Sequence, residues 1–102
     1  KSAIDNATDE EFRDIAIIKL ALLPEFSGSD QGYDEAVGLL GSVSRRRPLY
    51  YSAKFTKALL QSRRGYGESA RILLDEIVAD PDAPAAIKAQ ASAMAAYIKD
   101  SR

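Results

Sequence analysis

Two phrases in this chain of 102 residues are nearly the same and begin 33 residues apart. The stretch from Gly32 to Leu40 reads GYDEAVGLL, and the stretch from Gly65 to Leu74 reads GYGESARILL. Each phrase has Gly-Tyr, one further residue, Glu, a small residue and then a pair of leucines. Periods of about 34 residues are typical of stacked helical hairpins, in which neighbouring hairpins complete each other's core. The spacing therefore predicts a stack of antiparallel helices.

A weaker similarity relates Asp5–Ala16 to Asp80–Ala91, which begins 75 residues later. In this alignment Phe12 corresponds to Ile87, and Arg13 corresponds to Lys88. The chain is long enough for one domain with its own core. We therefore expect residues 1–102 to form a single helical-repeat domain that is a fragment of a longer chain.

Apolar residues recur at helical spacing in several segments, and no segment alternates as a half-buried strand would. Pro and Gly mark the connections between these segments. The sequence therefore predicts an all-α fold of about five helices, arranged as an α-solenoid fragment. The expected helices run over Thr8–Leu23, Tyr33–Val43, Pro48–Arg64, Tyr66–Ala79 and Ala83–Lys99, each end being approximate.

Two of these segments differ in their apolar pattern. The first has one apolar stripe, made by Phe12, Ile15, Ala16, Leu20 and Leu23. The third has two apolar faces, which indicates a helix covered on both sides rather than a surface helix. One face carries Leu49, Ala53, Thr56 and Leu60, and the other carries Tyr51, Phe55, Ala58 and Leu59.

The chain has no Cys and no His. Disulfides, thiolate chemistry and Cys-ligated metals are therefore excluded, and tightly held zinc is not expected. Acid-base catalysis at neutral pH most often uses His, and no His is present to activate a Ser or Thr. We expect no catalytic residues, no metal site and no cofactor. No apolar run approaches the ~20 residues that span a bilayer.

Charge is distributed unevenly along the chain, although the net charge is −1. Residues 1–35 carry nine acids and three bases, whereas residues 36–71 carry one acid and eight bases. A basic groove built on the central helix would attract an acidic peptide or protein surface. The candidate partner-binding residues are Arg47, Tyr51, Lys54 and Phe55.

The same residues also have a structural interpretation. Tyr51 and Phe55 are also expected as core residues, and Arg47 and Lys54 as solvated charges. Self-association is a further alternative, because the acidic first third could dock on the basic middle of another copy.

A nucleic-acid interface is the alternative from a different class. Arg45–Arg47 stand close to Tyr50–Tyr51, and Arg on phosphate with Tyr stacked on a base is an established mechanism. However, Arg63 and Arg64 lie at the other end of the same helix, roughly 25 Å away at 1.5 Å per residue. The net charge of −1 also differs from the strongly positive charge that is typical of nucleic-acid-binding proteins.

The GYDEA phrase resembles the second-helix motif of tetratricopeptide repeats. The run ARILLDEIVADPDAP, the Ala-rich segment after it and FRDIAIIKLALL resemble a narrower group. These are bacterial inner-membrane proteins with one N-terminal span and a periplasmic repeat domain, some of them associated with the Sec translocon and periplasmic chaperones. The resemblance implies a non-catalytic scaffold on the periplasmic side of the inner membrane, attached through a segment outside this chain. A cytoplasmic repeat adaptor is the alternative.

Overall fold

The predicted all-α fold is confirmed by a computed structural model, which describes the backbone of residues 3–100 and the side chains of residues 9–98. Within these residues the chain forms helices and no strands. Five of the helices correspond to the expected segments, and a short one lies between the first two. They are α1 (Ala3–Leu22), α2 (Pro24–Ser27), α3 (Asp30–Gly41), α4 (Tyr50–Arg63), α5 (Gly67–Ala79) and α6 (Ala85–Asp100).

The first connection is more helical than the sequence predicts. Helix α1 already includes Thr8, because no Pro or Gly interrupts the chain between Ala3 and that residue. The expected loop Pro24–Gly32 contains α2, with Pro24 at its first position, where a missing N–H costs nothing. Helix α3 begins at Asp30 because the Ser29 hydroxyl accepts a hydrogen bond from the backbone N–H of Gly32 at 3.0 Å.

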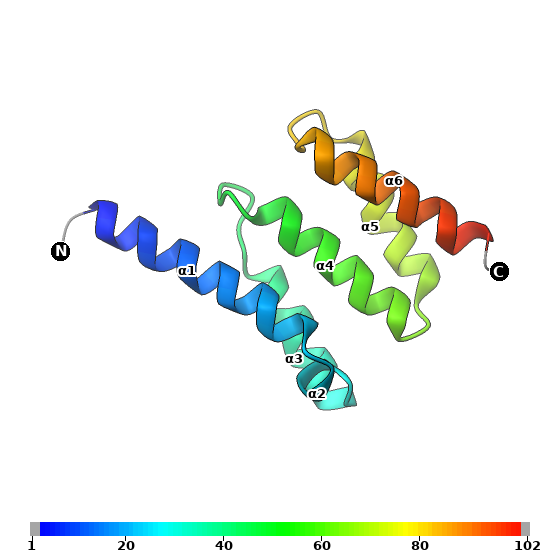
Figure 1. Cartoon of the computed structure of the whole chain (residues 1–102), viewed down its shortest axis with the longest axis horizontal. Helices are drawn as coiled ribbons and strands as arrows, with labels where there is room; N and C mark the ends of the chain where they lie inside the picture. Colours follow the sequence, from blue (N-terminus) through cyan, green and yellow to red (C-terminus); the bar gives the residue numbers. More distant parts are fainter. Residues whose placement is uncertain (1–2, 101–102) are drawn as a thin grey trace.

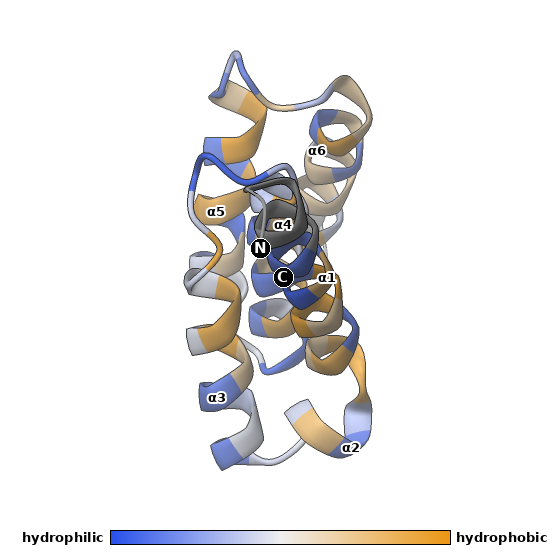
Figure 2. Ribbon diagram, turned by 90° about the vertical axis from the view of Figure 1, so that its left-hand side faces the viewer, coloured by the Kyte–Doolittle hydropathy of each residue, from blue (hydrophilic) through white to orange (hydrophobic). Residues whose placement is uncertain are grey.

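The helices form two layers. Figure 1 shows α1, α4 and α6 side by side and running in the same direction, with α3 and α5 behind them. Figure 2, turned by 90°, places α3 and α5 on one side of the molecule. Consecutive long helices are antiparallel, so α1 with α3 and α4 with α5 form hairpins. The extents of 51 × 34 × 15 Å fit a slab two helices thick.

Helix α4 is the central element, as its two apolar faces predict. Tyr51 and Ala58 belong to one buried cluster, and Ala53 and Leu60 belong to the other. The first cluster joins α4 to α5 and α6, and the second joins it to α1 and α3. Their further buried members are Ala70, Leu74, Ile77, Ala83, Ala91 and Ile98 in the first, and Ile17, Ala21, Ala36, Leu40 and Val43 in the second.

The expected orientation of α1 is wrong. The predicted apolar stripe lies on the solvent side, and Phe12 is 65% exposed. The buried residues of this helix are instead Asp14, Ile17 and Ala21. This reversal has a physical cause, because Asp14 finds a cationic partner inside the molecule, as shown below.

The two Gly-Tyr phrases meet in space. The ring centroids of Tyr33 and Tyr66 are 5.9 Å apart, and the Arg64 guanidinium lies 5.0 Å from the Tyr33 ring. The glycines have different roles. Gly65 has a φ of +88°, a conformation that residues with a Cβ rarely adopt. Gly32 lies in the first turn of α3 and lets the chain pass close to the carbonyl of Phe26.

Substituting two glycines of α3 should have opposite effects on stability. A Cβ at residue 32 would lie 1.6 Å from the backbone oxygen of Phe26, so Gly32→Ala should cost about 2 kcal/mol. A Cβ at residue 38 would meet nothing within 4 Å, so Gly38→Ala should raise the free energy of unfolding by up to about 1 kcal/mol. Urea denaturation of both variants checks this. Equal effects would mean that the turn before α3 is not packed as described.

Candidate protein-interaction surfaces

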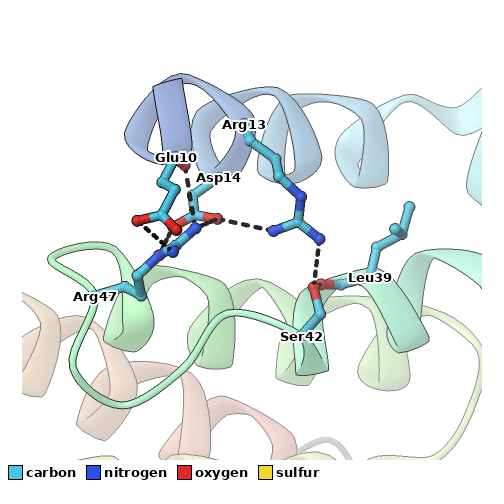
Figure 3. A network of polar contacts seen from close by, with 6 residues as sticks. All are labelled: Glu10, Arg13, Asp14, Leu39, Ser42 and Arg47. Atoms are coloured by element: carbon cyan, nitrogen blue, oxygen red, sulfur yellow. Dashed lines mark hydrogen bonds and ion pairs between the residues drawn. The ribbon is translucent and has the colours of Figure 1, made fainter. Parts of the chain in front are cut away.

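Arg47 lies in the connection between α3 and α4 and faces α1. Its Nε donates to Asp14 Oδ2 at 2.9 Å, and its Nη2 donates to Asp14 Oδ1 at 3.0 Å. Its Nη1 is 3.0 Å from the Glu10 carboxylate (Figure 3). The hydrogen bond with Asp14 is the main reason that the pKa of Arg47 is raised. Arg47 therefore binds the α3–α4 connection to α1.

Asp14 is the centre of this network and is completely buried. Arg13 approaches Asp14 Oδ1 at 3.4 Å and also donates to the Ser42 hydroxyl at 3.2 Å, as Figure 3 shows. A buried carboxylate is tolerated only when it is paired and hydrogen-bonded. The bidentate contact with Arg47 meets this requirement.

Tyr51 belongs to a second polar network, at the connection between α5 and α6. Its hydroxyl donates to Asp80 Oδ2 at 2.7 Å, and Arg45 Nη2 reaches the same oxygen at 2.9 Å. The backbone N–H of Asp82 donates to Asp80 Oδ1 at 2.9 Å. These contacts, the backbone one first, lower the pKa of Asp80. Burial and the hydrogen bond to Asp80 raise the pKa of Tyr51.

The lowered pKa of Asp80 predicts a stability change in acid. In the unfolded chain Asp80 titrates near its ordinary value of 3.8, whereas in the folded chain it titrates lower. Its contribution is complete above 3.8 and disappears as the pH falls through the folded pKa. Asp80→Asn should therefore destabilise the protein at pH 7, and its difference from the wild type should shrink below pH 3.8. The urea midpoints of Asp80→Asn and the wild type, measured from pH 7 to below pH 3.8, check this prediction. A difference between the two proteins that stays the same at every pH would contradict it.

Lys54 and Phe55 lie on α4 with different surroundings. Lys54 Nζ is 2.9 Å from Glu76 Oε1 on α5 and 5.7 Å from the centroid of the Tyr50 ring. Phe55 is partly buried against the cluster shared with α5 and α6. The four predicted partner-binding residues thus face α1, the α5–α6 connection, α5 and the core. The structure does not gather them on one surface.

One of the four, Lys54, lines an open cleft between α3, α4 and α5. The cleft has a volume of about 260 Å³. Two lysines and Glu76 give it a mixed charge, since Lys54 is already paired with that carboxylate. Its lining residues include Leu40, Val43, Tyr50, Lys54, Lys57, Leu73 and Glu76.

The residues of the nucleic-acid alternative are largely engaged within the chain. Arg45 contacts Asp80, and Arg47 contacts Asp14. Tyr51 is buried and packs edge-on against Tyr50, with ring centroids 4.9 Å apart. At the other end of α4, Arg64 pairs with Asp30. Arg45 nevertheless stays 57% exposed and lies 5.8 Å from the centroid of the Tyr50 ring, whereas Arg47, Arg64 and Tyr51 are engaged within the chain.

The outer face of α1 carries several exposed large apolar side chains, and sequence reasoning missed it as a surface. We define this face as Phe12, Ile15, Lys19, Leu22 and Leu23. At 100° per residue Phe12, Ile15, Lys19 and Leu22 lie on the side away from the buried residues of the same helix, and Leu23 follows directly after its last residue. Figure 1 shows α1 at one end of the stack, and none of the other described long helices lies on its outer side. Ile17 and Ala21 are four residues apart, and this helical spacing could have indicated that their side of α1 faces the core.

The chain is, by its fold, a two-layer all-α protein. Comparison with known protein families, characterised proteins and solved structures finds no match. Among the side chains of residues 9–98, no group of three or more His, Cys, Asp or Glu is placed to hold a metal ion. In residues 3–100 no helix is both long and apolar enough to cross a membrane.

Proposed function

We propose that this protein is a non-catalytic interaction module that binds a protein partner through the outer face of α1. The observation that carries this proposal is the exposure of four large apolar side chains on that face, Phe12, Ile15, Leu22 and Leu23. Contiguous exposed apolar surface on a soluble domain is typical of an interface.

The energetics favour a partner on this face. Fully burying one exposed large apolar side chain contributes about 1.5–3 kcal/mol. Phe12 is 65% exposed and offers most of this gain, whereas Ile15, Leu22 and Leu23 are 36–48% exposed and each add a smaller share. The interior networks do not depend on the face, because Asp14 and Ile17 point the other way. A partner can therefore bind without rearranging the core.

A photo-crosslinking amino acid at Ile15 tests the proposal in cells that produce the protein. A matched control carries the same amino acid at Ile72, which is 59% exposed on α5 and lies outside the face. We expect discrete adducts from position 15 and few from position 72. Equal yields from the two positions would contradict the proposal.

We also propose a location on the periplasmic side of a bacterial inner membrane, as part of a scaffold linked to protein translocation or envelope chaperones. The support for this is the resemblance of the phrases GYDEA and ARILLDEIVADPDAP to such proteins. The complete reading frame tests it. An apolar segment of ~20 residues upstream would support the location, and a frame without a span or signal would favour a cytoplasmic adaptor.

A further inference from the structure

We propose that the partner of the outer face of α1 is the same face of a second copy, with the two α1 helices antiparallel. This inference rests on the proposed function, because it uses the same surface and names what binds there. It follows from the order of charges along the helix and from the apolar residues among them.

Glu11, Ile15 and Lys19 are spaced four residues apart, so they lie along one line of the helix surface. All three are exposed. An acid precedes Ile15 by about one turn and a base follows it by about one turn. A twofold axis near Ile15 would therefore place Glu11 of each copy opposite Lys19 of the other. A parallel pairing would place like charges together.

These two charges are available for a partner. Among the described side chains, neither Glu11 nor Lys19 has an ion-pair partner, whereas Glu10 contacts Arg47. Glu11 lies at the edge of the outer face, where it also lines a hollow with Arg46 and Pro48. Beyond Lys19, α1 carries no acid, and the residues up to Leu22 are apolar. The basic and apolar half of one α1 thus complements the acidic half of another.

The apolar side chains support the same orientation. At 100° per residue Phe12 and Lys19 lie on the same side of Ile15, so an antiparallel pairing brings the Phe12 ring beside Lys19 of the other copy. The aliphatic part of a lysine can cover such a ring while its ammonium group stays in water. Ile15 lies near the axis and meets its own counterpart, which buries the centre of the face.

Sedimentation velocity of the purified chain provides the first test. The concentration should run from roughly 10 μM to 0.3 mM, where an interface of one helix face per copy is expected to dissociate. We expect the wild type to move from monomer to dimer. Glu11→Lys and Lys19→Glu should each weaken the dimer about tenfold, because each places like charges opposite one another.

Two combinations make the test specific to the antiparallel arrangement. The double variant E11K/K19E should recover the dimer, because the opposite charges are exchanged. A 1:1 mixture of the two single variants should form a mixed dimer, since one copy then offers two lysines and the other offers two glutamates. Thermal melts monitored by circular dichroism confirm that each variant is folded. A wild type that stays monomeric, or a dimer insensitive to these changes, would overturn the inference.

The crosslinking experiment separates this inference from the proposed function. An adduct of twice the chain mass at position 15 supports both proposals. An adduct with a different protein, from a chain that is monomeric when pure, supports the proposed function and rejects the second copy. No adduct above the Ile72 control, together with a monomeric chain, rejects both.

Discussion

Replacing Asp14 by alanine is expected to lower the free energy of unfolding by about 3 kcal/mol, as removal of one member of a buried ion pair typically does. The Asp14 side chain is only 1% exposed and accepts two hydrogen bonds from Arg47. Without the carboxylate, the Arg47 guanidinium, whose side chain is 20% exposed, loses its buried partner and keeps only its contacts with the exposed Glu10. Urea denaturation followed by circular dichroism measures the change.

Glu10 provides a matched control, because it contacts the same arginine from an exposed position. Glu10→Ala should change stability little, since solvent screens exposed ion pairs. Replacing both partners, as Asp14→Leu with Arg47→Met, should recover much of the loss, because no unpaired buried charge then remains. A single variant Asp14→Ala as stable as the wild type would mean that this network does not join α1 to the α3–α4 connection.

Replacing Leu74 by alanine should be at least as damaging, at about 3–4 kcal/mol. Leu74 is completely buried in the cluster that joins α4, α5 and α6. Its truncation removes apolar contacts and leaves a cavity that the surrounding helices can only partly close. The free energy of unfolding from urea titration measures this loss.

Ile72, two residues earlier on α5, is the control. Its side chain is 59% exposed, so Ile72→Ala should change stability by less than about 0.5 kcal/mol. Losses of similar size at both positions would show that α5 is rotated relative to the arrangement described. The pair therefore tests the orientation of this helix as well as the size of the core.

The sequence predicts the central helix better than the first. Helix α4 carries apolar residues on both sides, and both sides are buried, so its interior position could be inferred from spacing alone. Helix α1 has a predicted apolar stripe, but Ile17 and Ala21 lie outside it, and periodicity does not say which side meets the core. Here the side with Asp14 is buried, because Arg47 from a distant part of the chain pairs with it. That partner cannot be identified from the pattern of α1 alone.

Three ion pairs join residues that are separated in sequence by about one repeat length. Asp14 and Arg47 are 33 residues apart, Asp30 and Arg64 are 34 apart, and Arg45 and Asp80 are 35 apart. The uneven charge distribution therefore reflects contacts between neighbouring hairpins, at least for these pairs. The sequence contains this regularity, and a search for opposite charges at the repeat period would have found it. The candidate site residues Arg47 and Tyr51 would then have been interpreted as inter-hairpin contacts.

The two buried clusters share α4, and this affects how the protein unfolds. Because one helix closes both clusters, neither end of the stack keeps a complete core when α4 is lost. Repeat arrays are stabilised by contacts between adjacent units, and a unit in the middle takes part in two such contacts. Amide hydrogens of α4 should therefore exchange only through opening of the whole molecule, while those of α1 and α6 can also exchange through fraying at the ends.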